Sequence, residues 1–331
     1  MKVCIYGVGA IGGFIGTRLA LAGDCQVSAV ARGATLAALQ AHGLRLRQGG
    51  ELHSAAVRVS ADPAALGVQD LVLVAVKAPA LAEVAARIAP LVGPGTLVLP
   101  AMNGVPWWFG AGAPALGSEP LDSVDPGGRI AAAIPLARVI GCVVHASTAT
   151  SAPGLVEHKM GQGLIIGEPL GGVSDRVQAL AGLLQRAGFD VTASADVRRE
   201  LWYKLWGNMT MNPITALTGA TVDRVLDDPL TRAFCSAAMA EAAAVGARVG
   251  CAIDQTAEDR HLITRKLGAF KTSMLQDVDA GRPIELDALV TVVREIAQRV
   301  GLATPFIDAL LGLARLHGRV HGLYPQAATA G

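Results

Sequence analysis

The sequence has little charge and almost no net charge. Of its 331 residues, 17% are charged, and 28 basic and 27 acidic side chains leave a formal net charge of +1. A chain so balanced gives no reason to expect nucleic acid or an anionic membrane as a partner. The hydrophobic fraction of 52% excludes a disordered chain, and the length suffices for two domains with cores of their own.

Cysteine pairs with the spacing of a redox or zinc motif are also lacking. The five cysteines are odd in number and form no Cys-x-x-Cys: they are Cys4, Cys25, Cys142, Cys235 and Cys251. Isolated thiols are typical of a reducing cytoplasm and argue against a disulfide framework. His145, His158 and His261 are scattered without the spacing of metal ligands, so we expect no metal site.

No apolar run qualifies as a membrane span. Residues 88–118 contain no charge, but five prolines and several glycines interrupt them, which a spanning helix would not tolerate. Residues 3–17 are uncharged as well and resemble the core of a signal peptide. Their glycine spacing accounts for them better, so we expect a cytoplasmic protein.

What the sequence does have is a βαβ pattern at its N-terminus. An apolar strand over residues 2–6 leads into Gly7-Val8-Gly9-Ala10-Ile11-Gly12, a helix-period pattern follows, and a second strand covers 27–30. Gly7 permits the tight turn, Gly9 lets the backbone approach a pyrophosphate, and Gly12 lets the helix pack on the strand. The free N–H groups and positive dipole end of the helix would then face the phosphates. This order of elements predicts a dinucleotide site in a Rossmann-type domain.

The end of the second strand lacks the acidic residue that normally binds the ribose 2′-hydroxyl of NAD. Arg32 stands there instead, twenty residues after Gly12. A guanidinium can bind a 2′-phosphate through two hydrogen bonds, whereas a carboxylate would repel it. We therefore predict NADPH as the cofactor. The alternative is a surface arginine whose stem covers the adenine site and reads no phosphate.

Two domains are expected, an α/β Rossmann-type domain over residues 1–195 and an all-α domain over 196–331. The first alternates strands and helices: we expect strands near 70–76, 96–99, 139–148, 164–167 and 190–192, and helices near 79–90 and 173–187. Pro153-Gly154 marks a turn between two strands, and residues 110–135 read as a loop insertion. The second shows long helical patterns near 198–217, 228–250, 254–279, 284–300 and 304–315. The tail after Tyr324 is expected to fray.

A narrow polar stripe lies on the helix expected over 198–217. Lys204 is the only charged residue between Glu200 and Asp223, and Asn208 and Asn212 follow it at i+4 and i+8. A solvated helix face would carry several charges. A lysine shielded from water has a lowered pKa, which is what a general acid needs near pH 7. The alternative is that the amides tie helices together while the lysine reaches out to water.

Polar residues also follow two expected strands of the first domain. Lys77 ends the strand 70–76, and Asn103 follows the strand 96–99. The carboxyl ends of strands in a doubly wound sheet open onto the ligand, so both side chains could face the nicotinamide ribose or the substrate. A solvated helix-start lysine and a turn asparagine are the structural alternatives.

Ser273 and Glu285 are weaker candidates on local grounds. Ser273 falls inside the helix expected over 254–279, and Glu285 begins the helix 284–300, where the helix dipole alone would favour a carboxylate. Nothing in their immediate surroundings indicates catalysis.

Taken together, these residues resemble the ketopantoate reductase (2-dehydropantoate 2-reductase) family over almost the whole chain. The matching segments are Gly7-Val-Gly-Ala-Ile-Gly12, Val76-Lys77, Asn103-Gly104, Lys204-Leu-Trp-Gly-Asn208 with Asn212-Pro-Ile-Thr-Ala216, and Ser273-Met-Leu-Gln-Asp277 with Glu285 twelve residues after the serine. The resemblance implies an NADPH-dependent reduction of ketopantoate to pantoate in pantothenate synthesis.

The resemblance also implies a role for each residue. Lys204 would be the general acid that protonates the ketone oxygen, and Glu285 the acid that orients the substrate. Asn208, Asn212 and Ser273 would contact the hydroxyl and carboxylate end of the substrate. Lys77 and Asn103 would lie near the nicotinamide.

Three departures from the family pattern leave the substrate open. Trp107 and Trp108 follow the Asn-Gly, residues 110–135 are unusual, and Leu-Asp-Ala-Leu-Val after Glu285 lacks a common Asn-Gly. The tryptophans could narrow the site or stack on a different substrate. A reductase of another branched or aromatic 2-oxo acid, and a non-catalytic NADP-binding regulator, remain as alternatives. The helical region could offer a face for a homodimer, but the sequence does not locate one.

Overall fold

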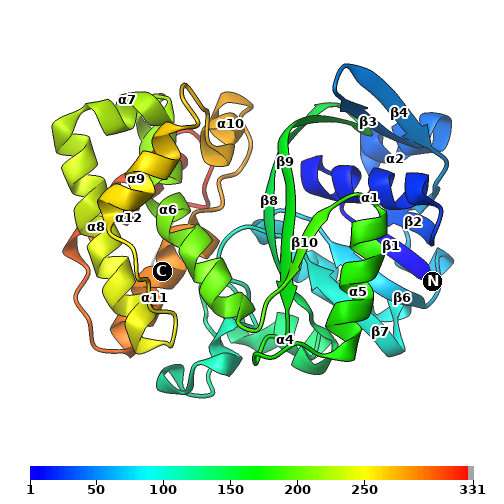
Figure 1. Cartoon of the computed structure of the whole chain (residues 1–331), viewed down its shortest axis with the longest axis horizontal. Coiled ribbons are helices and arrows are strands. Elements are labelled where there is room, and N and C mark those ends of the chain that lie inside the picture. The colour runs from blue at the N-terminus through cyan, green and yellow to red at the C-terminus, as the bar shows by residue number, and fades with distance from the viewer. Residues whose placement is uncertain (327–331) are drawn as a thin grey trace. The chain divides into compact units, whose positions relative to one another are not determined.

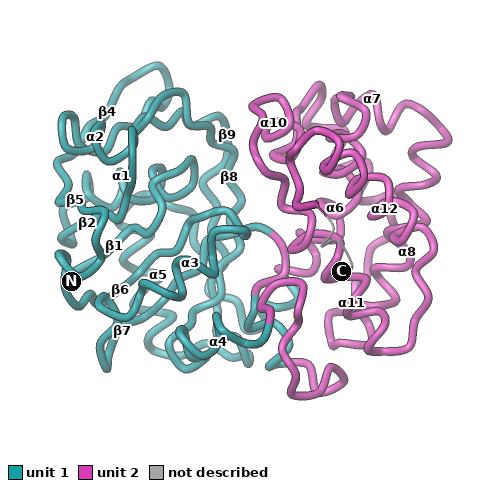
Figure 2. The backbone as a smooth tube through the Cα atoms, turned by 180° about the vertical axis from the view of Figure 1, so that it is seen from behind, with its two compact units in different colours: residues 1–103, 107–112, 127–200 teal, residues 104–106, 113–126, 201–331 magenta. Residues whose placement is uncertain are grey.

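The computed structural model describes residues 1–326 and divides the chain into two compact units (Figure 2). Unit 1 comprises residues 1–103, 107–112 and 127–200, and unit 2 comprises residues 104–106, 113–126 and 201 onward. Unit 1 has the α/β architecture and unit 2 the helical architecture that the sequence predicts, although both units are discontinuous in sequence (Figure 1). Part of the tail after Tyr324, residues 327–331, lies outside the described residues.

A parallel five-stranded sheet forms the centre of unit 1. Its order is β5-β2-β1-β6-β7, with β1 (Lys2–Tyr6), β2 (Gln26–Val30), β5 (Arg58–Ser60), β6 (Gln69–Val74) and β7 (Val92–Pro100). β1 pairs with β2 on one side and with β6 on the other, so the order in which strands are added to the sheet reverses at β1. Ligands of such sheets bind at the carboxyl ends of the strands beside this reversal.

A second sheet in unit 1 is mixed. It contains β3 (Leu44–Gln48), β4 (Glu51–Ala55), β8 (Gly141–Ala152), β9 (Leu155–Gly167) and β10 (Asp190–Ala193), in the order β10-β9-β3-β4 with β8 also paired to β9. The expected turn at Pro153-Gly154 joins β8 and β9, and Gly154 has a φ of +67°. Both strands are longer than the sequence predicts, and β3, β4 and β5 were not predicted at all.

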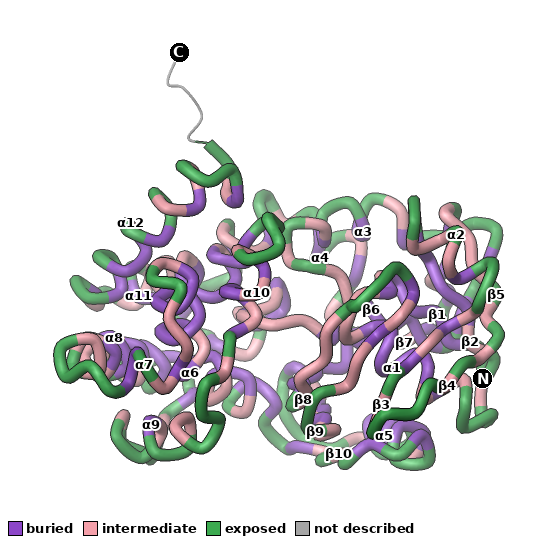
Figure 3. Tube along the Cα trace, turned by 90° about the horizontal axis from the view of Figure 1, so that it is seen from above, coloured by how far each residue is buried: buried purple, intermediate pink, exposed green. Residues whose placement is uncertain are grey.

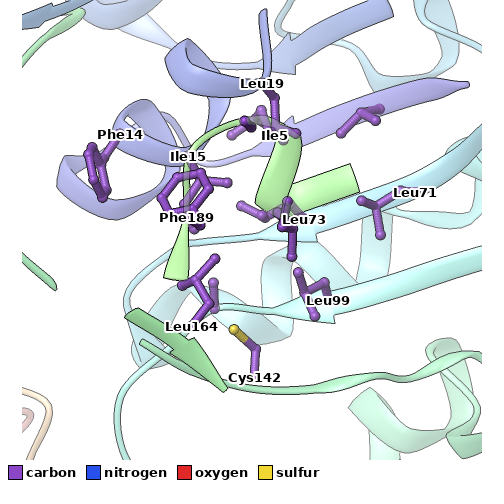
Figure 4. Close-up of a cluster of buried hydrophobic side chains, with 14 of the residues drawn as sticks. Ile5, Phe14, Ile15, Leu19, Leu71, Leu73, Leu99, Cys142, Leu164 and Phe189 are labelled. Atoms are coloured by element: carbon purple, nitrogen blue, oxygen red, sulfur yellow. The ribbon is translucent and has the colours of Figure 1, made fainter. Parts of the chain in front are cut away.

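Helix α1 (Ala10–Ala22) contacts strands of both sheets. A buried cluster joins them, with Ile5, Leu73 and Leu99 from the parallel sheet and Leu164 and Cys142 from the mixed sheet (Figure 4). The other helices of unit 1 are α2 (Gly33–His42), α3 (Leu81–Arg87), α4 (Arg129–Ala133) and α5 (Asp175–Arg186). The loop insertion expected over 110–135 is wrong in part, because α4 and several 3₁₀ turns lie within it.

Unit 2 is built from helices, with no strand among its described residues. They are α6 (Val197–Thr218, whose first residues belong to unit 1), α7 (Val222–Asp227), α8 (Pro229–Arg248), α9 (Ala257–Arg265), α10 (Ser273–Asp279), the π-helix η8 (Asp287–Thr291), α11 (Val292–Arg299) and α12 (Pro305–Val320). Of the helices within residues 1–326, none has both the length and the apolar character needed to span a membrane.

The single helix expected over 254–279 is wrong. It is two helices, α9 and α10, each with its own N-cap: Thr256 accepts from the N–H of Asp259, and Thr272 accepts from the N–H of Leu275. Gly268 between them has a φ of +61°, which ends the helical path. Ser273 is therefore the first residue of α10 and does not lie inside a long helix.

Candidate functional site

The glycine turn of unit 1 has the geometry that a dinucleotide needs. Gly7 has a φ of +97°, and a Cβ on Gly12 would lie 2.0 Å from the carbonyl oxygen of Gly7, so only glycine allows this contact between helix and strand. Gly9 is the N-cap of α1, and a Cβ there would meet no heavy atom within 4 Å. The space in front of Gly9 and the first-turn N–H groups of α1, which lack intrahelical acceptors, suit a pyrophosphate.

The segment after β6 packs against the same turn. A Cβ on Gly7 would lie 2.6 Å from Cγ1 of Val76, and one on Gly12 would lie 3.0 Å from the Cβ of Ala75. β6 ends at Val74, so the prediction that Lys77 ends this strand is wrong by three residues. Lys77 is exposed and is the N-cap of the 3₁₀ turn Ala78–Ala80, one residue after Val76.

Arg32 has a carboxylate partner that the sequence did not reveal. It is the N-cap of α2, two residues after the end of β2, and its Nη1 and Nη2 both bind Glu83 of α3, the second at 3.0 Å. Nη1 of Arg87 lies 3.8 Å from the same carboxylate. Burial raises the pKa of Tyr6 at the end of β1, and charges on Arg87, Glu83 and Arg32 act on it as well. Two guanidinium groups thus flank one carboxylate where β1 and β2 end.

Asn103 follows β7, and the backbone directly after it forms a hydrogen bond with a residue far along the chain. Gly104 has a φ of +85°, and the N–H of Val105 donates to the carbonyl of Ala288 at 2.8 Å. A Cβ on Gly104 would lie 2.4 Å from that carbonyl oxygen. Ala288 belongs to η8, the π-helix that begins two residues after Glu285. The backbone next to Asn103 is therefore bound to the turn that follows Glu285, and π-helices of this kind are frequent at functional sites.

Lys204, Asn208 and Asn212 all lie on α6, at the i, i+4 and i+8 spacing of one helix face. Lys204 and Asn208 are partly exposed, while Trp202 and Trp206 on the same helix are fully buried. The indole N–H of Trp202 donates to the carbonyl of Ala242 at 3.2 Å, and that of Trp206 to the carbonyl of Met239 at 2.7 Å. These bonds to α8 fix the rotation of α6, and with it the direction of the stripe.

The C-terminal end of the stripe contacts α10. Asn212 is buried, and its Nδ2 lies 3.4 Å from Oγ of Ser273. One turn further along, the hydroxyls of Thr215 and Thr272 lie 2.6 Å apart. The structure thus brings together Asn212 and Ser273, which are 61 residues apart in sequence. Glu285 is buried in the same unit.

The two tryptophans after Asn103 are buried. Trp108 is 3% exposed, and its ring lies 2.9 Å from the position of a Cβ on Gly141, which belongs to unit 1. The Trp108 ring packs in the interior of this unit. Within residues 1–326, no three His, Cys, Asp or Glu side chains are grouped to hold a metal ion.

Comparison with known proteins agrees with this arrangement. The model of the ketopantoate reductase PanE/ApbA family matches residues 3–171, and the model of its C-terminal domain matches residues 196–318. The chain belongs to the ketopantoate reductase family. Members of this family are oxidoreductases, and both of its domains are present here.

Individual ketopantoate reductases match over nearly their full length. The 2-dehydropantoate 2-reductase of Mesorhizobium japonicum is 45% identical over 98% of this chain and 100% of its own. A solved Ralstonia solanacearum MolK2 protein assigned to the ketopantoate reductases is 58% identical, with a TM-score of 0.94 over 97% of this chain and 99% of its own. D-mandelate dehydrogenase solved with NADH and anilino(oxo)acetate shares the fold at 20% identity, with a TM-score of 0.83 over 98% of this chain and all of its own.

Proposed function

We propose that the protein reduces ketopantoate to pantoate with NADPH. The observation that carries this proposal is the polar stripe of α6, in which one lysine and two amides lie on one face of a largely buried helix and the last amide contacts Ser273. The Mesorhizobium japonicum relative, which matches over its whole length, is named for this reaction.

The glycine turn and the N-terminus of α1 would hold the pyrophosphate, through Gly7, Val8, Gly9, Ala10, Ile11 and Gly12. Lys77 and Asn103 follow two neighbouring strands of the parallel sheet, β6 and β7, and would contact the nicotinamide ribose. A reduced nicotinamide supplies the hydride when bound. Arg32 would bind the 2′-phosphate, which requires Glu83 to release the guanidinium or to share it.

Lys204 would act as the general acid. Negative charge grows on the ketone oxygen as the carbonyl carbon is reduced, and an ammonium beside that oxygen stabilises the charge and then donates its proton. Asn208, Asn212 and Ser273 would hydrogen-bond the hydroxyl and carboxylate end of the substrate, and Glu285 would orient it. A substrate that lacks the hydroxyl would leave these polar groups without partners.

Kinetic assays with several 2-oxo acids test this function. We expect kcat/KM for ketopantoate to exceed that for 2-oxoisovalerate, which lacks the hydroxymethyl group, by at least about 100-fold. Phenylglyoxylate, an aromatic 2-oxo acid, should react more slowly still. A higher kcat/KM for either competitor would assign the enzyme to another substrate, and no turnover with any of them would favour the NADP-binding regulator.

A further inference from the structure

Helix α12 is apolar on two sides. One side is buried against unit 2 through Ile307, Leu310, Leu311, Ala314 and Gly318. The other side exposes a second set of apolar residues, and Figure 3 shows exposed and buried segments alternating along this helix. We call this second set the α12 stripe: Phe306 is 43% exposed, Leu313 60%, Leu316 61% and Val320 72%, with exposed Ala309 between the first two.

The α12 stripe has the spacing of a helix–helix seam. Its members follow one another at intervals of three, four, three and four residues, which is the a/d pattern of a coiled coil. At 100° per residue they fall within an arc of about 80° on the helix surface. Single exposed apolar residues are common on monomers, but a continuous stripe of four large ones marks an interaction site.

We propose that the α12 stripe binds the α12 stripe of a second copy of this chain, antiparallel and about a two-fold axis at Leu313. The helix surfaces that border the stripe on its two sides, here called its edges, decide the orientation. One edge is occupied by residues such as Leu310, which is 1% exposed and already packs within unit 2. Parallel helices place opposite edges in contact and would need this covered edge. Antiparallel helices place like edges in contact and use only the open one.

The open edge is suited to this contact in shape and in charge. A Cβ on Gly312 would meet nothing within 4 Å, so a second helix can approach closely beside it. Asp308 lies near the N-terminal end of this edge, where it also pairs with Arg294 of its own chain at 2.9 Å, and Arg315 and Arg319 lie near the C-terminal end. An antiparallel copy brings Asp308 close to the partner's Arg319, whereas a parallel copy would align like charges. A two-fold axis also makes the contact closed, which yields a dimer and no filament.

Sedimentation velocity of the full chain tests the interface. We expect a dimer at micromolar concentrations, and a monomer for the double variant Leu313→Glu/Leu316→Glu. Leu52→Glu is the matched control, since Leu52 is 52% exposed on β4 of unit 1, and it should remain a dimer. A monomeric wild type, or a dimer that survives the double variant with circular dichroism unchanged, would overturn the proposal.

Cysteine cross-linking tests the orientation separately from enzymatic activity. The two-fold axis places Leu313 beside its own copy, so Leu313→Cys should form a disulfide-linked dimer under mild oxidation. Phe306 should lie near the partner's Val320, so Phe306→Cys/Val320→Cys should cross-link and Phe306→Cys alone should not. Efficient cross-linking of Phe306→Cys alone would show a parallel pair and contradict the proposed arrangement.

Discussion

At the scale of single residues, Arg32 illustrates what a motif predicts and what it leaves out. Its position after the second strand is legible in the sequence, because it occupies the place where NAD-binding proteins have an acid. Its partner Glu83 is not, because the two are 51 residues apart and only the tertiary fold brings this residue of α3 to the N-cap of α2. The carboxylate changes the prediction, since a 2′-phosphate must compete with it for the same guanidinium.

Cofactor titrations of two variants separate these contributions. Arg32→Ala should weaken NADPH binding by about 10-fold or more, as expected for the loss of charged hydrogen bonds, and NADH binding much less. Glu83→Gln should have the opposite effect and strengthen the binding of NADPH relative to that of NADH, because the carboxylate that competes for Arg32 loses its charge. Dissociation constants from nicotinamide fluorescence measure both.

Arg186→Ala is the matched control for those titrations. Arg186 is an exposed arginine of unit 1 with an ion pair of its own, to Asp24, and its loss should change neither constant. Equal losses of NADPH and NADH in Arg32→Ala would refute the 2′-phosphate role.

At the scale of elements, the sequence predicts strands and helices well where their apolar residues form a clear pattern, and poorly where they do not. The parallel strands β1, β2 and β6 are short apolar runs, and the sequence indicates them at once. β4 has no buried residue, because it lies exposed at the end of the mixed sheet, so no hydrophobic pattern marks it. The helix expected over 254–279 failed for the opposite reason, since an amphipathic pattern continues across Gly268 although the backbone does not.

The contact between Gly104 and η8 gives a prediction at this scale. Gly104→Ala should lower kcat more than it raises KM, because a Cβ 2.4 Å from the carbonyl of Ala288 displaces the turn next to Glu285. The positive φ alone should cost about 1–3 kcal/mol of unfolding free energy. Steady-state kinetics and urea unfolding measure the two effects.

Gly301→Ala separates backbone strain from this contact. Gly301 has a φ of +70°, but a Cβ there would meet nothing within 4 Å. We expect a similar loss of stability with normal kcat. If both variants turn over at the same rate, the contact with Ala288 has no part in positioning Glu285.

At the scale of the whole molecule, the linear order of the sequence conceals how the chain is divided. Residues 113–126 precede much of unit 1 in sequence but pack with unit 2, where the backbone N–H groups of Asp122 and Ser123 donate to Glu295 at 2.9 Å each. Composition shows only a Gly-, Pro- and Ala-rich stretch there. The partner that orders it is about 170 residues away, so no local pattern could assign it.

The division into two units also separates the residues proposed to bind the cofactor from those proposed to bind the substrate and donate the proton. The glycine turn and Arg32 belong to unit 1, whereas Lys204, Asn212 and Ser273 belong to unit 2. If Lys204 is the proton donor, its removal should abolish turnover and leave the nucleotide-binding unit intact. A general acid contributes about 100- to 10,000-fold to the rate, so the loss should be large.

The most direct measurement compares kcat with the NADPH dissociation constant in Lys204→Ala, with Lys266→Ala as an exposed-lysine control in the same unit. We predict that kcat for ketopantoate falls at least about 100-fold in Lys204→Ala while the dissociation constant stays within about twofold of wild type. Lys266→Ala should match wild type in both. Turnover that survives the loss of Lys204, or NADPH binding that is lost together with it, would contradict the account.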